Sequence, residues 1–118
     1  MSILNHRRQE PKTFDELMGC RYRSEKDLDC LAQRLGRYAD SIDSYEYRDS
    51  GYSILEARKD VNDPDRLRGV IEHIENDDVS TLDMDNASMK SAFGFTRLQR
   101  KHLLSDLKRR FNNLIRKR

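Results

Sequence analysis

Residues 96–116 read TRLQRKHLLSDLKRRFNNLIR, and this stretch predicts a long amphipathic helix near the C-terminal end of the 118-residue chain. Thr96 is followed three residues later by Gln99, a capping-box pattern that marks a helix start. At 100° per residue, the apolar side chains that follow cover an arc of about 120°, and cationic side chains cover most of the remainder. We therefore expect a helix over residues 97–116. Its apolar face consists of Leu103, Leu104, Leu107, Phe111, Leu114 and Ile115.

The charge of this helix contrasts with the charge of the rest of the chain. Of the 23 Lys and Arg residues, ten lie in residues 89–118, where Asp106 is the only acid. The other acids lie in residues 1–88, and the stretch 69–89 contains six of them and no Lys or Arg. The formal net charge of +2 therefore conceals an acidic block followed by a basic tail, which is the most informative feature of the sequence.

A second long helix is expected over residues 25–46. Ser24 and Asp27 form another capping-box pattern. The apolar side chains that follow recur at gaps of three and four residues, which places them on one stripe of the helix. Such a heptad-like seam packs inside its own domain or against a partner helix, and the second alternative predicts a homodimer. The seam residues are Leu28, Leu31, Leu35, Tyr38, Ile42 and Tyr45.

Shorter helices are expected between and around these two. Residues 13–19 form one that stops at Gly19, and residues 54–61 form another. Pro64, preceded by Asp63 as N-cap, begins a helix that ends near residues 76–78. Gly94 ends a further short helix before the basic one.

The fold class that these elements predict is all-α, with four to six helices in a single compact domain. Turn-forming residues at 49–51 separate alternating apolar positions, which leaves open a small β-hairpin over residues 45–54. Residues 1–12 are expected to be a flexible basic arm, and residues 13–118 form the helical domain.

The basic helix is the strongest functional candidate in the sequence. A dense cationic face binds polyanions by releasing their condensed counterions, so we expect an accessory protein that binds DNA or RNA with low sequence specificity. About six phosphate contacts would give a slope of log K against log salt near −5 for duplex DNA. Alternatively, the acidic block over residues 72–85 balances this face internally. The residues expected to contact nucleic acid are Arg97, Arg100, Lys101, Lys108, Arg109, Arg110, Asn113, Arg116 and Lys117.

A protein–protein adaptor or inhibitor of a larger complex is the second function that the sequence allows. Tyrosines are favoured anchors in protein interfaces. Acidic side chains would attract a basic partner. The residues expected to bind a partner protein are Tyr38, Tyr45, Tyr47, Tyr52, Glu72, Glu75, Asp77 and Asp78.

Catalytic patterns are weak. His6, His73 and His102 stand far apart, with no acid or nucleophile at the spacing of a triad or a zinc site. The five glycines are scattered and form no phosphate-binding loop. We therefore expect no enzyme activity, no metal and no cofactor.

The two cysteines, Cys20 and Cys30, form neither a disulfide framework nor a zinc spacing. We expect both to be free thiols in a reducing compartment. No apolar stretch resembles a signal peptide or a membrane span. The sequence thus predicts a cytoplasmic protein, or a nuclear one in a eukaryote.

Overall fold

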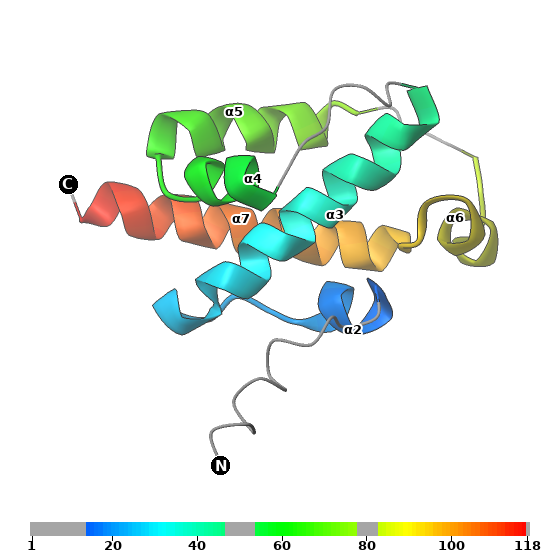
Figure 1. The fold of residues 1–118 in the computed structure, drawn as a ribbon, viewed down its shortest axis with the longest axis horizontal. Coiled ribbons are helices and arrows are strands. Elements are labelled where there is room, and N and C mark those ends of the chain that lie inside the picture. The colour runs from blue at the N-terminus through cyan, green and yellow to red at the C-terminus, as the bar shows by residue number, and fades with distance from the viewer. Residues whose placement is uncertain (1–13, 47–53, 78–82, 118) are drawn as a thin grey trace, which may run out of the picture.

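Two long helices, α3 (Leu28–Glu46) and α7 (Arg97–Arg116), cross at the centre of the fold (Figure 1). The computed structural model describes residues 14–46, 54–77 and 83–117. Its elements form one all-α domain, which confirms the predicted fold class. The predicted boundaries of the basic helix are confirmed, and the first three residues of the other predicted long helix form a separate 3-10 turn.

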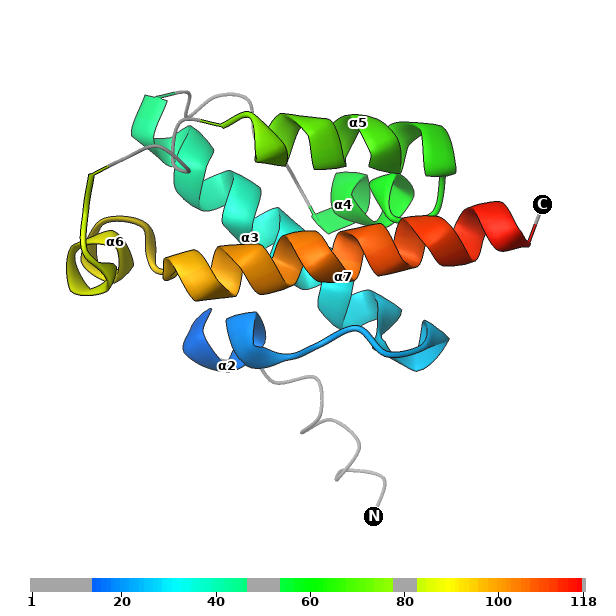
Figure 2. The ribbon, with the colours of Figure 1, turned by 180° about the vertical axis from the view of Figure 1, so that it is seen from behind.

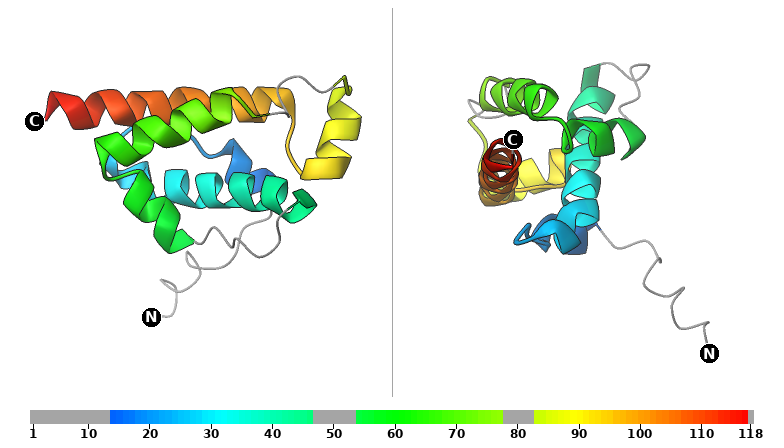
Figure 3. Two further views of the ribbon diagram at one scale, coloured as in Figure 1. Left: turned by 90° about the horizontal axis from the view of Figure 1, so that it is seen from above. Right: turned by 90° about the vertical axis from the view of Figure 1, so that its left-hand side faces the viewer.

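Shorter helices surround the two long ones in two layers. Helix α5 (Pro64–Glu75) packs along α7, and α4 (Ile54–Asp60) packs against α3. Figure 3 shows α3 and α4 in one layer and α5 and α7 in the other. On the side of α7 opposite α5 lies α2 (Phe14–Gly19), followed by η1 (Glu25–Asp27) (Figure 2). Helix α6 (Asn86–Phe93) lies beside the N-terminal end of α7.

The helix starts follow the capping rules that the sequence predicts. Ser24 and Thr96 each accept a hydrogen bond from the third residue of the helix or turn, and that residue's side chain bonds back. Asp63 caps α5 in front of Pro64, which needs no amide hydrogen at this position. At the C-terminal end of α6, Gly94 adopts the left-handed conformation with φ 90°, and its amide donates to the carbonyl oxygen of Lys90.

The β-hairpin that the sequence left open is not supported. Tyr45 lies within α3, and Ile54 begins α4, so both edges of the alternating pattern are helical. Helix α3 continues to Glu46, so the helical period of the seam prevails over the alternating pattern. Residues 47–53 of the hairpin prediction lie outside the described residues, as do residues 1–12 of the predicted arm.

The hydrophobic core lies where α3, α5 and α7 meet. Leu31 and Leu35 of α3 are buried against Leu103 and Leu107 of α7 in one cluster. The same cluster contains further residues from α3, α4, α5, α6 and the connectors: Tyr22, Ala32, Tyr38, Ala57, Val61, Leu67, Ile71, Ile74, Met89 and Phe95. Helix α7 therefore lies at the centre of the core with one apolar face, as its sequence pattern predicts.

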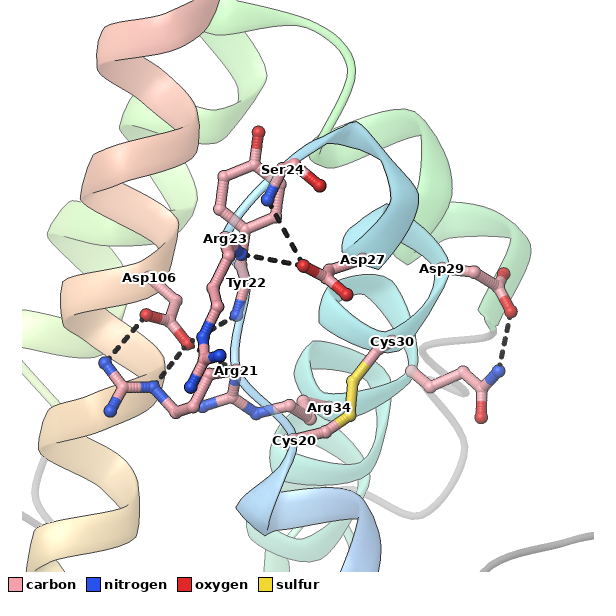
Figure 4. Close-up of a disulfide and its surroundings, with 11 residues drawn as sticks. Cys20, Arg21, Tyr22, Arg23, Ser24, Asp27, Asp29, Cys30, Arg34 and Asp106 are labelled. Atoms are coloured by element: carbon pink, nitrogen blue, oxygen red, sulfur yellow. Dashed lines mark hydrogen bonds and ion pairs between the residues drawn. A yellow bond between two sulfur atoms is a disulfide. The ribbon is translucent and has the colours of Figure 1, made fainter.

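The expectation of two free thiols is wrong in this structure. Cys20, in the connector after α2, forms a disulfide with Cys30 in the first turn of α3, with a Cα–Cα distance of 6.6 Å (Figure 4). The spacing gave no signal because a disulfide depends on how the connector folds back on the helix. Disulfides are typical of oxidising compartments, so one of the two arguments for a cytoplasmic location no longer holds.

Two glycine substitutions should change stability in opposite directions. Gly94→Ala places a side chain at φ 90°, and we expect it to lower the free energy of unfolding by about 1–2 kcal/mol. Gly69→Ala, in the middle of α5, should raise it by about 1 kcal/mol, because a Cβ there meets no atom within 4 Å. Urea denaturation of both variants measures the two shifts. A stabilising Gly94→Ala would contradict the left-handed conformation of this residue.

Candidate functional site

Asp106 lies in the middle of α7, and its side chain is fully buried. Its carboxylate accepts hydrogen bonds from Arg21 Nε and Nη2, each at 3.0 Å, and from Arg34 Nη1 at 2.7 Å. The backbone amide of Tyr22 donates to the same carboxylate at 3.0 Å. The only acid of the basic segment thus joins α7 to α3 and to the connector before η1 (Figure 4).

Burial and pairing act in opposite directions on these charges. Burial alone would raise the pKa of Asp106, but the hydrogen bonds from Arg21, Arg34 and the Tyr22 amide outweigh it and lower that pKa. The pKa of Arg34 is lowered, chiefly by burial, while its bond to Asp106 acts in the opposite direction. Among the described residues, Arg34 Nε and Nη2 have no hydrogen-bond partner. The fully buried guanidinium of Arg34 therefore depends on a single carboxylate.

Arg110, one turn after Asp106, is also buried. Its Nε donates to the carbonyl oxygen of Val61 at 2.8 Å, and its Nη2 donates to Asn62 Oδ1 at 2.9 Å. Its Nη1 lies 2.9 Å from a carboxylate oxygen of Glu25. The side chain thus satisfies the open carbonyl end of α4 and connects it to η1.

Arg100 forms a third polar contact, nearer the N-terminal end of α7. Its Nε donates to the hydroxyl of Tyr38 at 3.1 Å, and its Nη2 donates to the carbonyl oxygen of Ile74 and lies 3.4 Å from Asp77. The Tyr38 hydroxyl in turn donates to Asp77, and burial together with this bond raises the pKa of Tyr38. This cluster connects α7 to α3 and to the C-terminal end of α5.

Two of the more exposed cations of α7 are paired as well. Lys108 lies 2.7 Å from Glu75 on α5. Arg109 donates to the carbonyl oxygen of Tyr22 at 2.9 Å and lies 3.6 Å from Asp106.

The ends of α7 follow the same pattern. Lys117 contacts Glu25, and this lysine together with Arg110 lowers the pKa of that carboxylate. Arg97 donates to the carbonyl oxygen of Met84, just before α6.

The residues expected to contact nucleic acid are therefore largely engaged inside the molecule. Among the described residues of α7, Lys101 and Arg116 are the exposed cations that contact no acid. Asn113 donates to the hydroxyl of Tyr22. Most cations of this face are balanced by acids of the same chain, which is the alternative that the sequence left open. These acids are Glu75 and Asp77 of the acidic block and, outside it, Glu25 and Asp106. The sequence pattern did not identify these last two.

The residues expected to bind a partner protein do not form one exposed surface. Tyr38 is 2% exposed, and the side chain of Asp77 is 7% exposed. Glu72 and Glu75 are exposed on α5. The side chain of Tyr45 and the whole of Tyr47, Tyr52 and Asp78 lie outside the described part of the chain.

The residues of the helical seam that the structure describes are part of the domain's own core or pack against it. Leu31, Leu35 and Tyr38 are buried, and Leu28 is partly buried against them. The side chain of Ile42 is not among those described. A homodimer through this seam would therefore require the domain to open.

A groove of about 390 Å³ lies between α3 and α5. Its apolar lining comes from Leu35 and Ala39 on α3 and from Val70 and Ile74 on α5. Gly69, the residue before Val70, also lines the groove. Five polar residues complete the lining, and two of them belong to the predicted partner-binding set. These polar residues are Tyr38, Asp60, Arg66, His73 and Asp77. A concave, mainly apolar surface with a few polar groups is typical of a binding site.

The described residues contain no group of three or more His, Cys, Asp or Glu side chains placed to hold a metal ion. None of their helices combines the length and the apolar character needed to cross a membrane.

No family model matches the chain, and neither the curated proteins nor the solved structures contain a significant match.

Removing the charge of Asp106 should strongly destabilise the fold. Asp106→Asn leaves the buried Arg34 guanidinium without a counter-ion, and we expect a loss of about 3–5 kcal/mol in the free energy of unfolding. The matched control is Asp29→Asn, which breaks the exposed pair with Arg58 and should cost no more than about 1 kcal/mol. Chemical denaturation of the two variants measures both effects. Equal losses would mean that the buried cluster has no special role.

The same carboxylate should make stability depend on pH in acid. Because the pKa of Asp106 is lower in the folded state, its contribution is complete above its ordinary pKa of about 4 and is lost as the pH falls through the folded-state pKa. The melting temperature should therefore fall below pH 4 more steeply for the unmodified protein than for Asp106→Asn. Parallel melting curves of the two proteins below pH 4 would contradict this assignment.

Proposed function

We propose that this protein is a non-catalytic adaptor that binds a partner protein in the groove between α3 and α5. The observation that carries the proposal is the groove itself, with an apolar floor and polar ends. Tyr38 and Asp77 of the set that the sequence assigned to partner binding line this groove, but both are nearly buried and bonded to each other, so they shape its wall and do not anchor the partner. The internal pairing of Arg100, Lys108 and Arg110 adds support, because it removes cations from the competing nucleic-acid surface.

The shape of the groove favours an amphipathic helix as the occupant. Its α5 side runs from Arg66 to Asp77, which corresponds to roughly 16 Å along the helix axis at about 1.5 Å per residue. A partner helix of two to three turns presents apolar side chains at spacings of three and four residues over such a length. The polar groups at the two ends of the groove, Asp60 with Arg66 and Tyr38 with Asp77, then flank the apolar contact.

Gly69 fits this role better than a role in folding. A glycine inside a helix costs about 1 kcal/mol relative to alanine. No atom lies within 4 Å of the position that its Cβ would take, so close packing within the domain does not explain it. Without a side chain at this position, the groove stays open beside Val70 to an approaching helix.

Filling the groove should abolish partner binding without unfolding the domain. We expect Gly69→Leu, in the full chain, to lose the proteins that the unmodified chain captures from a native lysate, because its side chain occupies the groove. The matched control is Ser105→Leu, which adds the same side chain to the exposed face of α7 and should retain them. Quantitative mass spectrometry of the captured proteins gives the comparison, and melting curves verify that both variants are folded.

Nuclease treatment of the lysate separates the adaptor from the nucleic-acid alternative. The adaptor predicts that capture survives nuclease digestion and depends on Gly69. The adaptor proposal is rejected if nuclease abolishes capture and Gly69→Leu leaves capture unchanged. In that case the salt dependence indicates the number of phosphate contacts: a slope near −2 for duplex DNA corresponds to about two cations, as Lys101 and Arg116 would supply, whereas about six contacts give −5.

A further inference from the structure

A second cavity, of about 460 Å³, lies between the C-terminal end of α7 and the connector that leads into η1. Its lining combines three cations, one acid and three neutral polar side chains. The cations are Arg23, Arg116 and Lys117, the acid is Glu25, and the neutral residues are Tyr22, Ser24 and Asn113. The lining thus carries more positive than negative charge, and it comes from two segments far apart in the sequence.

The single acid of this cavity is already engaged. Glu25 contacts Lys117 and lies 2.9 Å from Arg110, and both cations hold its pKa below the ordinary value. Arg23 and Arg116 are exposed, and neither side chain contacts an acid among the described residues. Two guanidinium groups are therefore available to an anion, and arginine forks bind phosphate oxygens in a bidentate geometry.

One neutral donor adds to the two arginines. The hydroxyl oxygen of Ser24 accepts a hydrogen bond from the amide of Lys26, which leaves the hydroxyl hydrogen available as a donor. Tyr22 is fully buried and bonded to Asn113, so it supports the wall of the cavity. The cavity therefore combines positive charge with a hydroxyl donor, which is the chemistry that recognises a phosphate group.

We propose that this cavity binds a phosphate monoester carried by a side chain of a partner protein. An extended polyanion fits less well, because the central cations of α7 are engaged with the protein's own acids. A nucleotide also fits less well, because base recognition uses an exposed aromatic face, and the ring of Tyr22 is fully buried. This phosphate contact rests on the proposed adaptor function, to which it adds a second binding site. The cavity and the groove have no lining residue in common, so each can be tested separately.

The test is a titration of the full chain with inorganic phosphate and with O-phosphoserine, followed by amide chemical shifts at constant ionic strength. Shifts should centre on residues 22–25 and 113–117. Arg23→Gln and Arg116→Gln should each weaken binding about tenfold, because each removes a charged hydrogen-bond donor from the anion. The matched control is Arg37→Gln, an exposed arginine of α3 outside the cavity, which should leave the affinity unchanged.

Three results would overturn the proposal. Chloride at the same ionic strength could produce the same shifts, or the Arg37 control could weaken binding as much as the cavity variants. Both would indicate general screening of surface charge. Adenosine monophosphate could bind much more tightly than O-phosphoserine, which would assign the site to a nucleotide. Because Gly69→Leu leaves this cavity intact, failure of phosphate binding and failure of groove binding are distinguishable.

Discussion

The buried carboxylate of Asp106 joins three segments of the fold at one point: α7, α3 and the connector between α2 and η1. It accepts hydrogen bonds from Arg21 and the Tyr22 amide of the connector and from Arg34 of α3, and the side chains of Asp106 and Arg34 are fully buried. Arg34 without this carboxylate would be an unpaired charge in the core, which is among the costliest defects that a small domain can contain. The packing of α7 against α3 therefore has a polar requirement as well as an apolar one. Arg100 and Arg110 extend the same principle to the ends of α5 and α4.

This use of arginine explains how a chain with 37% charged residues maintains a core. Guanidinium groups satisfy the carbonyl oxygens that helices leave open at their C-terminal ends, as Arg110 does at Val61 and Arg100 does at Ile74. A large part of the basic character of α7 is therefore structural. Surface charge counted from composition overstates what this helix can offer to an external polyanion.

Local patterns in the sequence predicted the helices, their caps and most of the core. The capping boxes at Ser24 and Thr96 and the start at Pro64 each depend on neighbouring residues, and all three are confirmed. The internal pairing was not predictable in this way, because Arg21 and Asp106 are 85 residues apart. One local signal existed nonetheless. Asp106 and Arg110 share a helical face with Leu103 and Leu107, so charges on the apolar face already indicated buried pairs.

The central position of α7 has a consequence for how the chain reaches its native state. Each of the other helices packs against α7 or is tied to it through a side chain, yet α7 follows all of them in the sequence. During synthesis, the earlier segments emerge from the ribosome before the helix that neutralises their buried charges exists. Arg34 has no counter-ion until Asp106 has been translated. Folding of this domain is therefore completed only after α7 leaves the exit tunnel, and until then the apolar side chains that α3 and α5 bury against α7 lack that cover.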